Sequence, residues 1–94
     1  MGPIQTQMQS LLVKSLEPLK LEVINESNLH AGHGHEGPES HFRIKIATSK
    51  FEGKKRVERH RMVHSALSEL LRDKVHAITL DLYTPEEWAL IDSK

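Results

Sequence analysis

The first 25 residues show two hydrophobic periods in succession. Apolar side chains recur every three or four positions over residues 4–17, which predicts an amphipathic helix that ends before Pro18. From Leu19 to Val23 apolar and charged residues alternate, and this period of two predicts a half-buried strand over residues 19–25. The chain is therefore expected to begin with a helix and a strand.

The central part of the chain repeats this change of period. Residues 41–46 alternate strictly, which predicts a second strand with all its apolar side chains on one face. Apolar residues then recur at helical spacing from Lys54 to Arg72, which predicts one long helix or two short ones with a break near Arg59. The apolar run over residues 75–82 predicts a third strand.

The last element is predicted from its helix-start signals. The segment Thr84-Pro85-Glu86-Glu87 offers an N-cap hydroxyl, a first-turn proline and a glutamate that can bond back to the cap. A short helix is therefore expected over residues 84–92.

These elements follow the order αββααβα. A helical crossover between strands two and three predicts that they are parallel, and a loop between strands one and two predicts an antiparallel pair. The predicted fold class is α+β, with a three-stranded mixed sheet covered by helices on one face. At 94 residues the chain has room for a single domain, spanning residues 1–94.

Composition excludes several classes of function. The chain has no cysteine, which rules out disulfides, thiolate metal sites and thiol nucleophiles supplied by the protein itself. Neither a nucleophile with an obvious base nor a phosphate-binding loop occurs, so we expect a binding protein and not an enzyme. The first residues resemble neither a signal peptide nor a transit peptide, and no apolar run could span a membrane, so a cytoplasmic location is expected.

Charge is unevenly distributed although the formal net charge is zero. Residues 43–61, here called the basic block, hold eight of the thirteen Lys and Arg residues against two acids. The block could bind phosphates or carboxylates, or it could simply be solvated. Its candidate contacts for a partner or for nucleic acid are Arg43, Lys45, Lys54, Lys55, Arg56, Arg59, His60 and Arg61.

Histidines are the remaining candidates for metal chemistry. A glycine-rich segment over about residues 27–40, expected to be a mobile loop, contains His30, His33 and His35. The loop histidines could converge on a metal, or they could be solvated. His76 shares strand parity with apolar residues, so it is either a core histidine or a neutral imidazole available as a ligand.

The helical pair of His60 and His64 is a further candidate. The two residues are four positions apart, so they lie on one helix face, a spacing that suits zinc. The glutamate of the zinc-protease signature is missing between them, and neighbouring arginines disfavour a cation, so a surface role is expected.

Several motifs together resemble the BolA-like family. They are Glu39-Ser40-His41-Phe42, Ser49-Lys50-Phe51-Glu52-Gly53, Arg59-His60-Arg61-Met62-Val63-His64, Val75-His76-Ala77 and Thr84-Pro85-Glu86-Glu87-Trp88. The resemblance covers nearly the whole chain. It implies a fold related to the type II KH domain, which agrees with the element order predicted above.

The resemblance also implies a function in iron–sulfur trafficking or iron regulation. Members of this family pair with monothiol glutaredoxins and share a [2Fe–2S] cluster, to which the glutaredoxin cysteine and a bound glutathione supply thiolates. By motif, His76 is the cluster ligand of this chain, and His30 best matches the second, with His33 and His35 as alternatives. Two imidazoles can replace two thiolates on one iron, as in Rieske centres. The isolated chain is expected to hold no cofactor and to be a monomer or a weak homodimer.

Two other functions stay open. A DNA-binding transcriptional regulator would use the basic block on the KH-like fold, although the KH signature GxxG is incomplete because Gly53-Lys54-Lys55-Arg56 lacks the second glycine. A zinc or nickel buffer would use the histidines of the loop.

Overall fold

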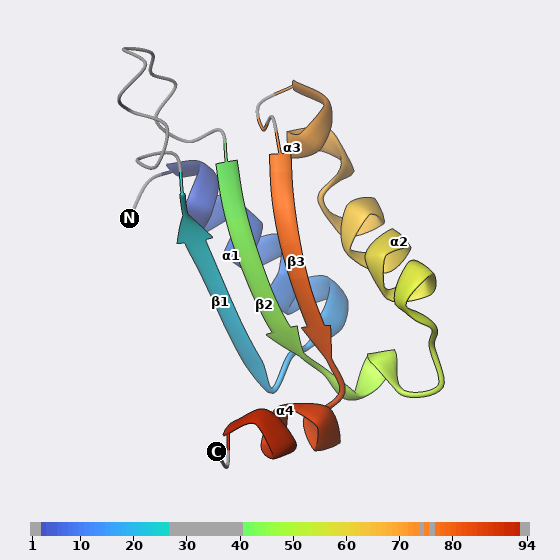
Figure 1. Ribbon diagram of the computed structural model, residues 1–94. Helices are drawn as coiled ribbons and strands as arrows, with labels where there is room; N and C mark the ends of the chain where they lie inside the picture. Colours follow the sequence, from blue (N-terminus) through green and yellow to red (C-terminus); the bar gives the residue numbers. More distant parts are fainter. Residues whose placement is uncertain (1–2, 27–40, 74, 76, 93–94) are drawn as a thin grey trace.

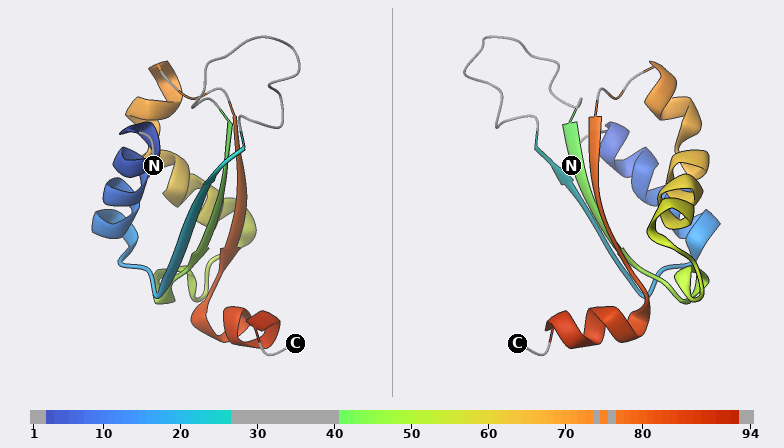
Figure 2. Two further views of the ribbon diagram at one scale, coloured as in Figure 1. Left: turned by 90° about the vertical axis from the view of Figure 1, so that its left-hand side faces the viewer. Right: turned by 45° about the vertical axis from the view of Figure 1, so that its right-hand side comes forward.

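The sheet and the helices form two layers. The structure is a computed structural model, and it describes residues 3–26, 41–73, 75 and 77–92. Three helices cover one face of the sheet, and the last helix lies at one end and extends toward the other side (Figures 1 and 2). The elements are α1 (Pro3–Leu16), β1 (Lys20–Asn25), β2 (His41–Ala47), η2 (Ser49–Phe51), α2 (Arg56–Ala66), α3 (Ser68–Asp73), β3 (Ala77–Tyr83) and α4 (Pro85–Asp92).

The sheet has the order β1-β2-β3, with β2 in the centre. β1 pairs antiparallel with β2, and β2 pairs parallel with β3, so the predicted mixed sheet is confirmed. In this register Val23, Ile44 and Leu80 lie side by side across the three strands. The period of two therefore places most large apolar residues of the three strands on the face that the helices cover, whereas Ile24 lies beside Arg43 on the open face.

The core lies between that face and the three helices. Phe42, Ile44 and Ile46 of β2 are buried to 1% exposure or less, as expected for a central strand. The helices and the break between α2 and α3 contribute the buried residues Met8, Leu12, Leu16, Val63, Leu67 and Leu70. Fully burying each large aliphatic or aromatic side chain is worth about 1.5–3 kcal/mol, so this layer contact is the main source of stability.

The helix predicted over residues 54–72 is divided, but not at the predicted place. Arg59 lies inside α2, and the break falls at Leu67, between α2 and α3. The N–H of Leu67 bonds to the carbonyls of both Val63 and Ser65, while its side chain is fully buried. The apolar stripe runs through the break without interruption, so the hydrophobic spacing gave no sign of it.

Helix α4 begins as its sequence predicts. The Thr84 hydroxyl accepts from the N–H of Glu87 at 3.2 Å, and the Glu87 carboxylate accepts from the N–H of Thr84 at 2.9 Å. No residue of α4 is fully buried, so its position depends on this cap and on contacts near its first turn. One of these is the edge-on packing of Trp88 against Tyr83, with ring centroids 5.7 Å apart.

The outer edge of β1 is partly closed by a side chain. Since β1 has a neighbour only in β2, alternate backbone groups of β1 point away from the sheet. The Val23 carbonyl is one of these, and it accepts from the Gln5 amide Nε2 of α1 at 2.6 Å.

Thr48 links the end of β2 to the end of α1. Its side chain is fully buried, and its hydroxyl donates to the Leu16 carbonyl at 2.7 Å and accepts from the N–H of Lys50 at 3.2 Å. These two bonds hold the C-terminal end of α1 and the start of η2 at the same point. A buried carbonyl that loses its donor costs about 1–3 kcal/mol.

We therefore expect Thr48→Val to lower the free energy of unfolding by about 1–3 kcal/mol, because the isosteric side chain cannot satisfy the Leu16 carbonyl. Urea denaturation at neutral pH measures this change. The matched control is Thr79→Val, at an exposed position of β3, which should change stability by less than about 0.5 kcal/mol. Equal losses in the two variants would contradict this role of Thr48.

Candidate functional site

The ends of three chain segments meet at one end of the sheet. Glu26 follows β1, and its N–H bonds to the carbonyl of His41, the first residue of β2, at 2.8 Å. His41 lies in register with Ala77, the first residue of β3. Segment 27–40 and residue 76 are therefore both attached at this end, here called the loop end of the sheet (Figure 1).

The candidate cluster ligands lie outside the described residues. This holds for His76 and for the loop histidines His30, His33 and His35, so their roles stay predictions. Within the part of the chain that the structure describes, no group of three or more His, Cys, Asp or Glu residues could hold a metal ion. The helical pair His60 and His64 is exposed, as the sequence suggests for a surface role.

The open face of the sheet is not the cationic surface that strand two predicts. Arg43 is paired, since its Nη1 donates to Asp81 of β3 at 2.9 Å and its Nε donates to Glu26 at 3.1 Å. These hydrogen bonds, the one to Asp81 first, raise the pKa of Arg43 above its already high ordinary value. Lys45 lies in register between Glu22 and Asp81. The alternating charges make this face nearly neutral, because the neighbouring strands supply the acids.

The exposed cations of the basic block gather at the opposite end. Gly53 adopts a φ of +76°, which a residue without a Cβ tolerates, and the chain turns there toward α2. Lys54, Lys55 and Arg56 follow and are exposed, as is Arg61 one turn later. The start of α2, the end of β3 and α4 all lie at this end, here called the α4 end (Figures 1 and 2).

Arg59 is used inside the protein. Its guanidinium donates to the Glu87 carboxylate at 2.8 and 3.3 Å, to the Leu82 carbonyl at 3.3 Å and to the Lys54 carbonyl at 3.0 Å. The side chain is only 11% exposed. It joins α2, β3, α4 and the turn before α2, so little of it is left to contact a partner.

Phe51 cannot serve as a stacking platform for bases, although it is the aromatic residue inside the basic block. Phe51 is the last residue of η2, and its side chain is fully buried. The Arg59 guanidinium carbon lies 5.7 Å from the ring centroid, close enough for a cation–π contact. The ring therefore contributes to the core and to the position of Arg59.

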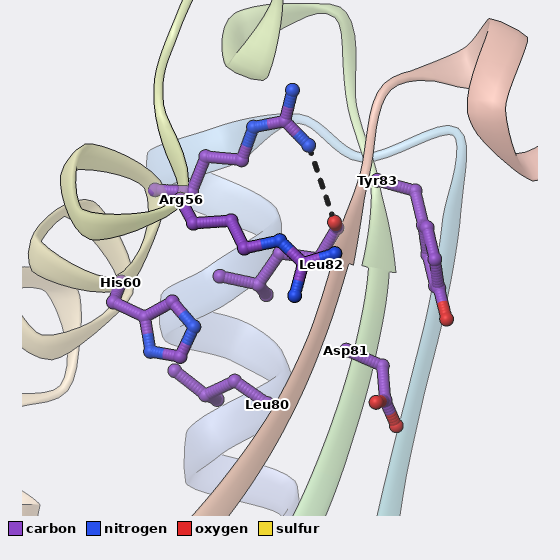
Figure 3. A pocket seen from close by; sticks show the side chains of 7 residues that line it. Arg56, His60, Leu80, Asp81, Leu82 and Tyr83 are labelled. Carbon is purple, nitrogen blue, oxygen red and sulfur yellow. Dashed lines mark hydrogen bonds between the residues drawn. The ribbon is translucent and has the colours of Figure 1, made fainter.

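Two adjoining hollows open beside Arg59. The first, of about 140 Å³, is lined by Arg56, Arg59, His60, Leu80, Asp81, Leu82 and Tyr83. Figure 3 shows His60 beside Leu80 on one side of β3, with Asp81 and Tyr83 on the other side. The second, of about 350 Å³, is lined by Lys54, Arg56, Arg59, Leu82, Tyr83, Glu87, Leu90 and Ile91. Because the two share four residues, they form one continuous depression, here called the α4-end groove.

The sequence indicates some residues of this groove and misses others. Arg56 and His60 belong to the predicted contact set, whereas Tyr83, Leu90 and Ile91 do not. The short final helix was the available signal, because a helix of eight residues cannot bury Trp88, Leu90 and Ile91 all at once. Trp88 and Ile91 are three positions apart and share a helix face, whereas Leu90 points in another direction, so at least one of the three must face solvent.

Comparison with known proteins identifies the family. The family model described as BolA-like protein matches residues 12–87. The chain belongs to the BolA-like family. BolA-like protein 1 of Mus musculus is 42% identical over 87 residues, which cover 93% of this chain and 62% of the mouse protein. A protein of Haemophilus influenzae named DNA-binding transcriptional regulator BolA is 39% identical over 85 residues, covering 90% of this chain and 81% of that protein.

Solved structures of BolA-like proteins share the fold. The BolA domain of SufE1 from Arabidopsis thaliana superimposes with a TM-score of 0.84 at 36% identity, over 93% of this chain and 98% of that one. The solution structure of mouse BolA1 gives a TM-score of 0.85 at 40% identity, over 98% of this chain and 73% of that one. No described helix is long and apolar enough to cross a membrane.

The ion pair between Arg59 and Glu87 should make stability depend on pH. The hydrogen bond from Arg59, and then that from the Thr84 N–H, lower the pKa of Glu87 below its ordinary value. A carboxyl group whose pKa is lower in the folded than in the unfolded state stabilises the fold at pH values above its unfolded pKa. This stabilisation is lost as the pH falls through the pKa of the folded state. Glu87→Gln should therefore destabilise the protein most at neutral pH, and less as the pH falls below about 4.3, the ordinary range of a glutamate.

Urea denaturation of wild type and Glu87→Gln between pH 7 and pH 3 measures this difference. The neighbouring Glu86→Gln is the matched control, because Glu86 is exposed and takes part in none of the ion pairs found among the described residues. A difference for Glu87→Gln that stays constant over this pH range would contradict the assignment.

Proposed function

We propose that this BolA-like protein is a non-enzymatic partner of a monothiol glutaredoxin, with which it shares a [2Fe–2S] cluster. The ligands from this chain are His76 and one loop histidine, of which His30 is the first candidate and His33 and His35 are the alternatives. The glutaredoxin cysteine and a bound glutathione supply the remaining ligands.

The observation that supports this proposal is the meeting of chain ends at the loop end of the sheet. The bond from Glu26 to His41 closes the base of segment 27–40, and His41 is the register neighbour of Ala77. Both candidate ligand regions thus leave the sheet at one end, although they are far apart in sequence. A second support is the missing cysteine, which gives imidazole a role that thiolates of this chain cannot fill.

The chemistry of such a site follows from its ligands. Neutral imidazole in place of thiolate removes negative charge from the cluster, so a shared cluster should have a higher reduction potential than one held by thiolates alone. The chain would contribute ligands and bind its partner, and it would catalyse no reaction. Since the cluster depends on a second protein for its thiolates, it should be held only in the complex.

Replacement of His76 tests the proposal directly. Mixing the wild-type protein with a cluster-loaded monothiol glutaredoxin should change the visible circular dichroism of the cluster and give a co-eluting complex. His76→Ala should abolish most of this spectral change, because an imidazole ligand is lost. The matched control is His64→Ala, at an exposed histidine of α2, which should behave as wild type. An unchanged spectrum with wild-type protein, together with no co-elution, would refute the proposal.

The loop histidines are compared in the same assay. His30→Ala should change the spectrum more than His33→Ala or His35→Ala does, although a neighbouring imidazole can rescue part of the loss. A loss of the spectral change that is confined to His33→Ala would show that His33, and not His30, is the second ligand.

Transcriptional regulation through DNA binding is the second candidate function. It is favoured by the name of the Haemophilus influenzae relative and by the exposed cations at the start of α2. Lys54, Lys55, Arg56 and Arg61 could contact phosphates, whereas the guanidinium of Arg59 is already paired with Glu87. With Phe51 buried, such binding would depend on charge and not on stacking of bases.

Electrostatic DNA binding should weaken steeply with salt. The logarithm of affinity falls linearly with the logarithm of salt concentration, with a slope of about 0.9 for each phosphate contact. Fluorescence anisotropy of a labelled duplex should show this dependence, and Lys55→Gln should reduce the slope by about one contact. Arg72→Gln, at an exposed residue of α3, is the control. A slope that does not change with Lys55→Gln would show that the start of α2 does not contact the phosphates of DNA.

A further inference from the structure

The α4-end groove is separate from the proposed cluster site. β3 runs from Ala77 at the loop end to Tyr83 in the groove. Seven strand residues at about 3.3 Å per residue separate these positions by roughly 20 Å. A ligand in the groove therefore contacts a surface that the proposed cluster does not use.

The groove has a positive charge that the protein does not neutralise. Three cationic side chains line it, those of Lys54, Arg56 and Arg59, against the two carboxylates of Asp81 and Glu87. Lys54 and Arg56 take part in none of the ion pairs found among the described residues. The groove should therefore attract an anionic occupant.

The other part of the groove is apolar. Leu90 is 66% exposed and Ile91 is 49% exposed, and both line the larger hollow. An occupant that covers them removes apolar surface from water, which is favourable by about 25 cal/mol for each Å². Apolar side chains next to uncompensated cations indicate an occupant with apolar and acidic groups close together. A duplex of nucleic acid offers phosphates but no side chain to cover Leu90 and Ile91.

The groove also borders a strand edge. β3 is the last strand of the sheet, and the Tyr83 carbonyl points inward, where it accepts from the N–H of Thr48 at 3.0 Å. Because strand residues alternate in direction, the backbone groups of Leu80 and Leu82 point outward. Arg59 bonds to the Leu82 carbonyl, and this bond is the dashed line in Figure 3. Leu80 lines the hollow, so this outer edge of β3 borders the groove. An extended peptide can pair with such an edge.

We propose that the α4-end groove docks an extended peptide segment of a partner protein in which acidic residues flank a leucine-like side chain. The carboxylates bind at Arg56 and Lys54, the apolar side chain covers Leu90 and Ile91, and the peptide backbone pairs with β3 near Leu80. This surface lies beyond the glutaredoxin function proposed above and leaves the loop end of the sheet free. A BolA-like protein with this groove can hold two partners at once.

The single tryptophan provides the measurement. Trp88 packs edge-on against Tyr83, which lines the groove, so a docked peptide should change its fluorescence. The probe is the unlabelled peptide acetyl-Glu-Asp-Leu-Glu-Leu-Asp-amide, titrated into the full chain at low and at physiological salt. A peptide with lysine in place of every acid should not bind.

Matched variants locate the binding. Arg56→Glu should weaken peptide binding about tenfold or more, because it reverses a groove cation that takes part in none of the ion pairs found among the described residues. Arg61→Glu makes the same change on the same helix at an exposed residue that does not line the groove, and it should have little effect. Leu90→Ser should also weaken binding. Leu19→Ser should not, because Leu19 is 62% exposed but lies outside the groove. Circular dichroism checks that each variant is folded.

Three results would overturn the proposal. Equal losses of peptide affinity in Arg56→Glu and Arg61→Glu would show that the peptide is attracted to the whole charged face of α2 and not to the groove. That behaviour is expected for DNA. Sedimentation that depends on protein concentration and is abolished by Leu90→Ser would show that a second copy occupies the groove. A Trp88 signal that does not respond to the acidic peptide would show that nothing of this chemistry docks there.

Discussion

The guanidinium of Arg59 connects more segments than any other polar group considered above. It bonds to Glu87 of α4, to the Leu82 carbonyl of β3 and to the Lys54 carbonyl before α2, and its cation faces the ring of Phe51. The hydrophobic layer positions α1, α2 and α3, but α4 buries no residue completely. The orientation of α4, and with it the shape of the groove, therefore depends on this charged contact, on the Thr84 cap and on the packing of Trp88 against Tyr83.

Short-range patterns in the sequence were sufficient for most of the fold. The period of two in residues 41–46 places Phe42, Ile44 and Ile46 in the core, and the Thr84 to Glu87 cap forms as its spacing indicates. These features depend on neighbours within a few positions. The break at Leu67 could not be predicted in the same way, because a buried leucine fits the helical stripe whether or not the helix ends there.

The candidate site was harder to predict because its charges are paired over long distances in sequence. Arg43 and Asp81 are 38 positions apart, and Arg59 and Glu87 are 28 positions apart. In the sequence each arginine belongs to the basic block, and only the strand register and the packing of α4 show that a carboxylate faces it. Among the described residues the basic block thus has fewer unpaired cations than the composition suggests, and Lys54, Lys55, Arg56 and Arg61 remain exposed. The histidine ligands follow from the family resemblance and stay predictions.

The bond from Gln5 to Val23 has a consequence for assembly. A sheet can grow by repeated addition of strands only if both of its outer edges accept one, since each added copy must offer an edge to the next. Here the amide of Gln5 occupies the Val23 carbonyl on the edge of β1, and the guanidinium of Arg59 occupies the Leu82 carbonyl on the edge of β3. A side chain thus already occupies one backbone acceptor on each outer strand of the described sheet, which disfavours repeated strand addition and polymerisation into fibres.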